Sequence, residues 1–422
     1  MVDSGSTAWI LMATAMVILM TAPGLALFYG GLVSERNVLS TLMHSFFILC
    51  LISVQWVLWG YSLAFGTSIG GIVGGLDLVG LGPLLGNALE GTGIPDLAFA
   101  MFQGAFAIIT VALITGAFAE RINFGAFVLF ALLWATLVYD PLAYWVWGGG
   151  FLMQLGVLDF AGGTVVHISS GVSALIAALV VGRRRGFPEK VSEPHNLPFT
   201  VMGASLLWFG WFGFNAGSAL AAGPLAALAL VTTNTAAGAA GLTWALLDWR
   251  FRGKPTVLGT ATGAVAGLVA ITPAAGFVSV LGALAIGVGG SVASYWGVNV
   301  LKARLGYDDT LDVFGVHGLA GTWGALATGL FATTSVNPAG ADGLFYGNAA
   351  QLGLQALGVV VGWAVAAVGT FIILKVVGAL VSLRVPEEHE EKGLDESLHG
   401  EVAYRYTMPT GSIAQWTMHE RR

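Results

Sequence analysis

Long uncharged apolar runs constrain the fold of this chain more than any other feature. Residues 8–28, 45–65 and 354–374 each reach the roughly 20 residues that a helix needs to cross a bilayer. Only 9% of all residues are charged, whereas soluble domains carry about 25%. The sequence therefore predicts an all-α integral membrane protein.

Polar breaks divide the apolar sequence into eleven expected membrane spans. They begin near Trp9, Thr41, Ala98, Phe124, Gly162, Pro198, Pro224, Thr256, Phe277, Val313 and Gln351. Basic residues occur only in alternate connections before the last span: Arg36; Arg121; Arg183, Arg184, Arg185 and Lys190; Arg250, Arg252 and Lys254; Lys302 and Arg304. Because cytoplasmic loops are enriched in Lys and Arg, this pattern predicts an outer N-terminus and a cytoplasmic tail.

Two histidines, His167 and His317, lie in the fifth and tenth expected spans, each written Val-His-x-x-x-Gly. An aspartate precedes each one, Asp159 and Asp312. With five spans in each half, a repeated half must be inverted, so the two histidines would enter from opposite faces and meet near the midplane. The sequence predicts an inverted five-helix repeat plus a peripheral eleventh helix at about residues 351–383.

The two histidines have a structural and a functional interpretation. A single histidine in a membrane helix often only bonds a neighbouring helix. The matched pair favours a functional site, because ionisable groups at bilayer depth normally face a pore or a partner. Touching imidazoles would share one proton and titrate as a unit, which suits proton transfer.

The two aspartates also leave alternatives open. Asp159 can cap its helix, attract cations to the outer mouth, or do both. Capping is favoured for Asp312, which follows Asp308 and Asp309 near the opposite face.

Aromatic residues cluster near the outer ends of several spans. Phe102 and Phe106 share one face of the third span, and packing is the ordinary explanation for either ring. Composition favours an interfacial belt for Trp147. The functional alternative is a cation–π cradle, with the Ser218 hydroxyl as an acceptor at its outer end.

Several segments of this sequence resemble the ammonium transporter (Amt) family of the Amt/Mep/Rh superfamily. They are Pro-Gly-Leu-Ala-Leu-Phe-Tyr-Gly-Gly at 23–31, Asp-Phe-Ala-Gly-Gly-Thr-Val-Val-His at 159–167, Gly-Trp-Phe-Gly-Phe-Asn-Ala-Gly-Ser at 210–218 and Asp-Val-Phe-Gly-Val-His-Gly at 312–318. The tail matches as well, and the resemblance extends from about Thr7 to Tyr406. It implies a homotrimer in the plasma (inner) membrane, with a pore in each eleven-helix protomer.

The resemblance also assigns site residues. Phe106, Trp147 and Ser218 resemble an outer ammonium-recruitment site, with Phe102 and Trp211 in the nearby wall. Phe106 and Phe214 resemble a phenylalanine gate, and His167 with His317 a twin-histidine pair below it. Asp159 resembles the aspartate needed for recruitment or deprotonation.

These assignments predict an ammonium transporter and neither an enzyme nor a nucleic-acid binder. Ammonium would lose its proton at the outer site, neutral ammonia would cross, and the histidines would relay the proton. Methylammonium would be a second substrate. No cofactor or metal is expected.

Residues 1–384 would form the transport domain, and 385–422 a cytoplasmic regulatory tail. The tail residues that match the family are Gly393, Leu394, Asp395, His399, Gly400 and Glu401. The resemblance implies that this tail binds a PII-family regulator and takes part in nitrogen sensing. An extension beyond Tyr406, with Trp416, Arg421 and Arg422, departs from the family pattern.

Two rival functions belong to other classes. Buried histidines can be axial ligands of a haem, which would make the chain a membrane redox protein. Alternatively, the protein is a sensor whose output is protein binding by the tail. The acidic run Glu387, Glu388, Glu390 and Glu391 is ordinarily just a solvated charge run.

Overall fold

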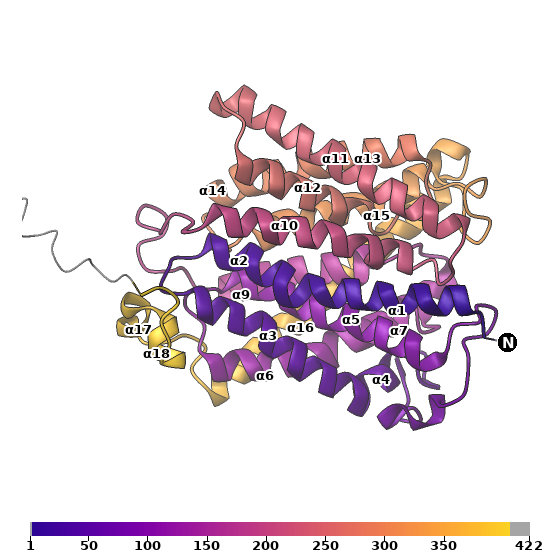
Figure 1. The fold of residues 1–422 in the computed structure, drawn as a ribbon, viewed down its shortest axis with the longest axis horizontal. Helices are drawn as coiled ribbons and strands as arrows, with labels where there is room; N and C mark the ends of the chain where they lie inside the picture. The colour runs from indigo at the N-terminus through magenta and orange to yellow at the C-terminus, as the bar shows by residue number, and fades with distance from the viewer. Residues whose placement is uncertain (1, 406–422) are drawn as a thin grey trace, which may run out of the picture.

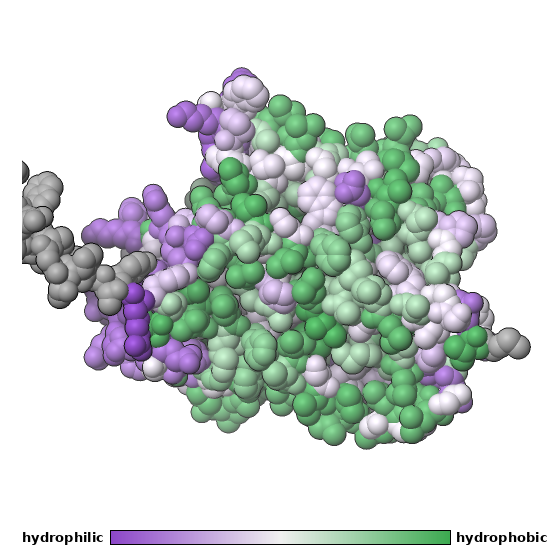
Figure 2. Space-filling model, viewed as in Figure 1, coloured by the Kyte–Doolittle hydropathy of each residue, from purple (hydrophilic) through white to green (hydrophobic). Residues whose placement is uncertain are grey.

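The computed structural model describes residues 2–405, so Tyr406 and the extension with Trp416, Arg421 and Arg422 lie outside the described residues. Its helices run side by side along one direction, with the N-terminus at one end and the C-terminal helices α17 and α18 at the other (Figure 1). Hydrophobic residues cover most of the visible flank between these ends, and hydrophilic residues gather around the tail (Figure 2). This distribution suits a bundle whose long sides face lipid.

The first half of the chain contains α1 (Ser4–Leu19), η1 (Met20–Leu25), α2 (Ala26–Leu32), α3 (Val38–Gln55), η2 (Trp56–Gly60), α4 (Tyr61–Phe65), α5 (Asp96–Ile114), η4 (Thr115–Ala117), α6 (Phe124–Trp134), η5 (Ala135–Tyr139), α7 (Asp140–Val146), α8 (Phe151–Leu155), η6 (Gly163–Ile168) and α9 (Ser169–Val181). The second half contains α10 (Leu197–Trp211), η7 (Phe212–Ala216), α11 (Pro224–Arg252), α12 (Val257–Ile271), α13 (Val280–Trp296), η8 (Gly297–Leu301), α14 (Lys302–Leu305), η9 (Phe314–Leu319), α15 (Ala320–Phe331) and α16 (Ala349–Leu380). Short elements are β1 (Ser68–Ile69), β2 (Val73–Gly74), η3 (Val79–Leu84), η10 (Leu344–Tyr346), α17 (Glu387–Lys392) and α18 (Leu394–His399).

Within residues 2–405, nine helical segments are long and apolar enough to cross a membrane. They match nine of the eleven expected spans. The expected eighth span is α12, which has only 15 residues, and the expected tenth span is η9 continued by α15. The prediction of a helical, multi-pass architecture is confirmed in this form.

Both histidines lie in widened π-helical turns at the start of a helix. His167 is in η6 and His317 is in η9. Such turns interrupt regular hydrogen bonding and occur often at functional sites. An aspartate side chain that accepts hydrogen bonds from backbone N–H groups caps the start of each segment.

The two caps are Asp159 and Asp309. The Asp159 carboxylate accepts hydrogen bonds from four backbone N–H groups, those of residues 162 to 165, at 2.6–3.2 Å. The Asp309 carboxylate accepts one from Phe314 at 2.7 Å. The expectation that Asp312 caps the second segment is wrong, because its carboxylate instead pairs with Lys302 at 2.6 Å.

Glycines let the two histidine segments cross closely. A side chain at Gly171 would collide with the backbone of Gly318, beside His317. A Cβ at Gly321 would lie 3.1 Å from the Cβ of His167. The glycine that follows each histidine by four positions therefore makes room for the other histidine segment.

Connections that contain basic residues lie at the end of the bundle where the C-terminal tail is. Arg184 forms ion pairs with Glu120 at 2.8 Å and Asp308 at 2.9 Å. Burial opposes ionisation of Glu120, but the Arg184 guanidinium and the Ser34 N–H outweigh it, so the pKa of this carboxyl lies below its usual value. These contacts join three connections that the sequence placed on one side of the membrane.

Arg121 anchors the same end. Its guanidinium is fully buried and donates to backbone or hydroxyl oxygens from Ala117, Ala119, Gly182, Asp308 and Thr310. Burial lowers its pKa to about 10, which leaves it charged at neutral pH.

Candidate functional site

The site is built around direct contact between the two histidine rings. His167 Nδ1 lies 3.2 Å from His317 Nδ1, and both side chains are buried. One nitrogen of this contact must donate and the other must accept, so a neutral pair holds one proton between the rings. The ring of His167 also stacks on Trp211 at a centroid distance of 5.3 Å.

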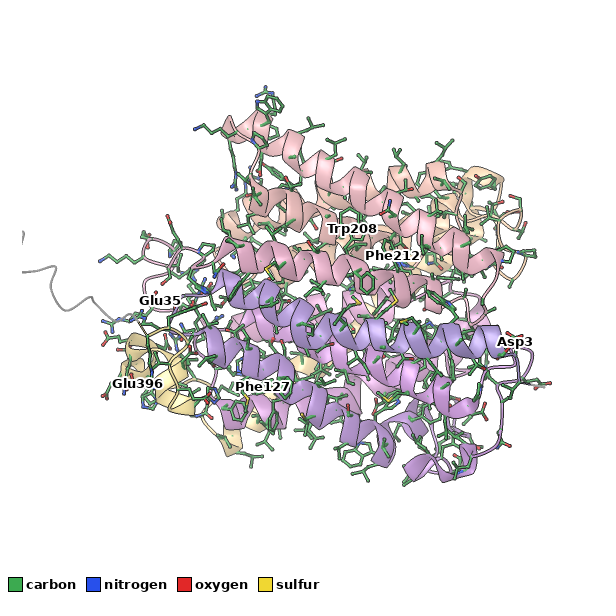
Figure 3. All side chains as sticks on the ribbon, in the orientation of Figure 1. Asp3, Glu35, Phe127, Trp208, Phe212 and Glu396 are labelled. Carbon is green, nitrogen blue, oxygen red and sulfur yellow. The ribbon has the colours of Figure 1, made fainter. Side chains whose placement is uncertain are left out.

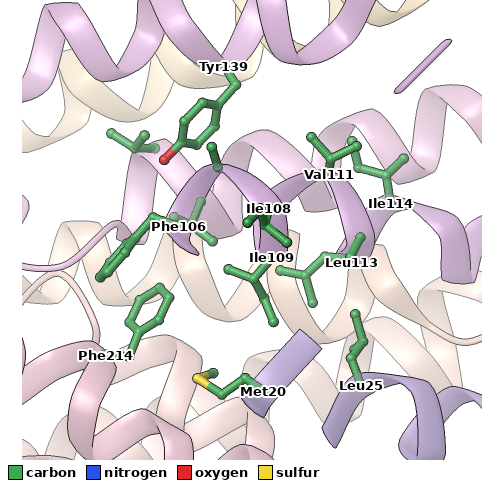
Figure 4. Close-up of a cluster of buried hydrophobic side chains, with 14 of the residues drawn as sticks. Met20, Leu25, Phe106, Ile108, Ile109, Val111, Leu113, Ile114, Tyr139 and Phe214 are labelled. Atoms are coloured by element: carbon green, nitrogen blue, oxygen red, sulfur yellow. The ribbon is translucent and has the colours of Figure 1, made fainter. Parts of the chain in front are cut away.

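Two stacked phenylalanines lie beside the pair. The rings of Phe106 on α5 and Phe214 on η7 are 4.1 Å apart at an interplanar angle of 26°. Their stacking is visible in Figure 4, where both point toward one another from facing segments. Phe214 is also 6.0 Å from His167, so the stack borders the histidine pair directly.

The remaining aromatic residues adjoin this stack. Phe102 packs edge-on against Phe106 at 4.9 Å, and Trp147 does so at 6.0 Å. Trp147 Nε1 donates to the Asp159 carbonyl at 3.0 Å. Trp147 is half-buried, with its ring against Phe106 and its N–H bound within the protein.

Ser218 and Asp159 complete the outer group. The Ser218 hydroxyl donates to the Phe214 carbonyl at 2.8 Å, which leaves its oxygen lone pairs available. The Ser218 side chain is partly exposed. All four backbone donors around Asp159 point at its carboxylate, so its charge is held in place and its oxygens are occupied.

A very narrow apolar space lies beside the histidine pair and reaches Phe214. Its volume is about 10 Å³, which is room for roughly one water-sized molecule. The residues that line it are Met20, Leu25, Phe28, Ile109, Leu113, His167, Leu207, Trp211, Phe214, Val265 and His317. Trp211 Nε1 is bound to Thr272 at 2.9 Å and offers this space no hydrogen bond.

A wider cavity also reaches His317. It has a volume of about 170 Å³, and Tyr29, Asp312 and Asn299 line it. Phe28 and His317 line both of these spaces, so the histidine pair borders each of them. The direct contact leaves no room for a macrocycle between the rings, so the haem interpretation fails on geometry.

Sequence reasoning missed the role of Asp309 at this site. Asp309 precedes His317 by eight residues, as Asp159 precedes His167. That equal spacing was the available signal. The choice of Asp312 overlooked it because three aspartates stand close together.

The tail residues form a second, separate group. Asp395 accepts hydrogen bonds from the backbone N–H groups of Leu39 at 3.0 Å and Ser40 at 2.8 Å, at the start of α3. Leu394 is fully buried, and its N–H donates to Asn37 Oδ1 at 2.8 Å. Figure 3 shows the neighbouring Glu396 at the same end of the bundle as Glu35, far from Asp3.

The rest of the tail motif supports this docking. Gly393 has a φ of 103° and lies so close to Arg36 that a side chain would collide with it. His399 packs edge-on against Phe124 at 5.3 Å, Gly400 ends α18 with a φ of 68°, and the Glu401 N–H donates to the Asp395 carbonyl at 3.2 Å. Burial lowers the pKa of His399, which favours its neutral form in the docked tail.

Comparison with known proteins gives consistent matches over nearly the whole chain. A model of the Ammonium Transporter Family matches residues 8–404. The ammonium transporter of Bacillus subtilis is 53% identical over 405 residues, covering 96% of this chain and 99% of the relative. That of Aquifex aeolicus is 50% identical, covering 95% and 94%. The crystal structure of Candida albicans Mep2 superposes with a TM-score of 0.86 at 38% identity, covering 92% of this chain and 88% of Mep2.

Proposed function

This chain belongs to the ammonium transporter family, and on that basis we propose that it recruits ammonium at an outer aromatic site and conducts it as ammonia and a separate proton. The contact between His167 and His317 carries this proposal. It lies next to an apolar space with room for roughly one small molecule. Transfer of an intact ion through such a space is costly, whereas a neutral molecule crosses cheaply.

Recruitment takes place where Phe106, Trp147 and Ser218 converge. Ring faces attract a cation that is losing its water, and the Ser218 oxygen accepts one N–H bond. Phe102 and Trp211 shape the adjoining wall. Potassium is of similar size but has no N–H bond to donate and no proton to lose, so the site distinguishes the two ions by chemistry.

Asp159 acts through its charge. Its carboxylate is held by four backbone donors, which supports a fixed electrostatic role over direct contact with the substrate. A negative charge close to Trp147 stabilises ammonium at the outer site and the proton that it leaves behind. Ammonia then passes the gate of Phe106 and Phe214.

The histidine pair relays the proton. When one Nδ1 donates to the other, a proton that arrives on one ring releases a proton from the other ring. Ammonium re-forms in the cavity beyond His317. The proton thus moves through the histidine pair, while ammonia crosses the same region as a separate neutral molecule.

Currents from proteoliposomes on a solid-supported membrane test the relay. We expect His167→Ala and His317→Ala to abolish ammonium-selective current, while the tail variant His389→Ala retains it. Unchanged, ammonium-selective current in both pore variants would exclude proton relay through the pair. Methylammonium uptake into cells that lack their own carriers tests transport itself, with the same three variants.

We also propose how the chain is arranged in the membrane. Eleven spans are arranged as two inverted halves, helices 1–5 and 6–10, with α16 across their outside. The N-terminus faces the exterior of the plasma membrane and the tail faces the cytoplasm. Three chains assemble in the lipid as a homotrimer with one pore each, which native mass spectrometry tests.

Residues 1–384 form the transport domain in this proposal, and the tail that follows is regulatory. The docked group from Gly393 to Glu401 reports the state of α3 to a PII-family protein at the cytoplasmic face. Its contacts with Asn37 and the start of α3 support that coupling. Pull-down from nitrogen-shocked cells, with Asp395→Ala as the comparison, tests whether the docked form is the one recognised.

A further inference from the structure

A buried carboxyl group outside the pore has no role in the transport scheme. Asp140 begins α7 and is fully buried within the apolar segment Phe124–Leu155. Its Oδ2 accepts a hydrogen bond at 2.8 Å from Nε2 of Gln55, the last residue of α3. Its Oδ1 has no hydrogen-bond partner among the residues that the structure describes.

The Gln55 side chain also has one unpaired oxygen. Its Oε1 is buried and also lacks a hydrogen-bond partner within residues 2–405. Its Nε2 lies 3.4 Å from Thr136 Oγ1 as well as 2.8 Å from Asp140, so both amide hydrogens have acceptors. Two acceptor oxygens in one bonded pair of side chains are thus left without a donor.

No positive charge from the described part of the chain compensates Asp140. None of the ion pairs found among residues 2–405 includes it. Its titratable chain neighbour, Tyr139, carries a phenol that cannot supply a positive charge. An ionised carboxylate at full burial with a single amide donor is strongly destabilised, because burial removes its water and nothing replaces it.

We propose that Asp140 is a proton-binding site, occupied by one proton and paired reciprocally with the Gln55 amide. The O–H on Oδ1 donates to Gln55 Oε1, and Gln55 Nε2 donates to Oδ2. One added proton therefore supplies the donor that both oxygens lack. The acid–amide pair links α3 to the start of α7 without placing a charge in the membrane.

The bound proton also affects the electrostatics near the outer site. Asp140 precedes Trp147 by seven residues, about 10 Å along a helix. In its neutral form Asp140 adds no negative charge there, so Asp159 alone of the two carboxyls acts on a cation beside Trp147.

Infrared difference spectroscopy of the full-length protein in lipid at neutral pH tests this assignment. We expect the wild-type spectrum minus that of Asp140→Asn to contain the C=O band of a protonated carboxyl, which shifts down in D₂O. The matched control is Asp342→Asn, because Asp342 is exposed and ionised. Its difference spectrum should show only carboxylate bands. In Gln55→Leu the acid band should move to higher frequency, since its acceptor is lost.

Stability supplies a second readout. Asparagine reproduces the hydrogen bonds of the neutral acid, so Asp140→Asn should assemble with a melting temperature close to that of the wild type. Asp140→Leu should melt lower, because it leaves the Gln55 amide without partners. Carboxylate bands in the Asp140→Asn difference spectrum, or failure of that variant to fold, would overturn the proposal. Neither result would bear on ammonium transport through the histidines.

Discussion

Asp159 and Asp309 occupy equivalent places, one before η6 and the other before η9. Each lies eight residues before a buried histidine, and each accepts a hydrogen bond from the backbone N–H of the fifth residue after it. A helix start within a membrane has unsatisfied N–H groups, and a fixed carboxylate stabilises them. The two caps therefore position the two histidines in the same way.

The first prediction concerns the cap that Asp309 provides. Asp309→Ala removes the acceptor of the Phe314 N–H and should lower stability by about 0.5–2 kcal/mol. The melting temperature in detergent measures this. Asp312→Asn is the control, because the Asp312 carboxylate pairs with Lys302 and asparagine tolerates the φ of 60° at this position. An equal loss in both variants would argue against a capping role for Asp309.

The second prediction concerns the crossing of the histidine segments. Gly171→Ala forces a side chain into the backbone of Gly318 and should destabilise the protein by about 1–3 kcal/mol or more. The shifted His317 should also reduce transport. Gly353→Ala in α16 meets nothing within 4 Å and should be neutral or stabilising, by about 0.5–1 kcal/mol. Thermal melting of the two variants gives the comparison, and normal melting of Gly171→Ala would contradict the crossing.

A third prediction addresses the docked tail. Asp395→Ala leaves the N–H groups of Leu39 and Ser40 without their acceptor, so the tail should detach more readily. Limited proteolysis of residues 385–405 should become faster. Glu396→Gln removes only an exposed pair with Lys392 and should leave the cleavage rate unchanged. Equal protection in all three proteins would show that Asp395 does not hold the tail.

The fourth prediction is a pH dependence of the tail end of the bundle. Burial opposes ionisation of Glu120 and Asp308, but Arg184 outweighs it and holds both pKa values below their usual 4.5 and 3.8. Their stabilising contribution is complete above those usual values and is lost as the pH falls through the lowered ones. The protection of residues 183–192 against hydrogen exchange, relative to the intrinsic exchange rate at each pH, should therefore fall steeply only below about pH 4.

Arg184→Gln provides the comparison for that measurement. Without the guanidinium, exchange should already be high at neutral pH and should change less on acidification. Arg185→Gln is a matched control, since the Arg185–Glu391 pair is more than half exposed and contributes little. An unchanged acid profile in Arg184→Gln would refute the role of this ion pair.

Much of the helical architecture could be predicted from hydropathy alone. The fourth helix begins at Phe124 as expected, and the third at Asp96, close to the expected Ala98. Such agreement arises because a membrane helix needs about 20 apolar residues and charged residues mark its ends. Widened turns such as η6 and η9 could not be predicted, because they depend on how neighbouring helices pack.

The candidate site was predictable where two residues share a pattern. The repeated Val-His-x-x-x-Gly motif indicated a common place for His167 and His317, and the structure brings their rings together. The setting of Trp147 was not predictable from composition, because an interfacial tryptophan and one bound to Asp159 have the same local sequence. The acid–amide pair of Asp140 and Gln55 joins residues 85 positions apart, and no local pattern indicates such a contact.

The capping of α3 by Asp395 in place of Asn37 has a consequence for biosynthesis. Asn37 stands at the ordinary capping position of α3, yet its side chain does not cap the helix and binds Leu394 instead. The carboxylate that completes the first turn of α3 comes from more than 350 residues later. A ribosome therefore releases the second membrane helix long before it makes the residue that finishes it, and a chain truncated before Asp395 leaves that helix incomplete.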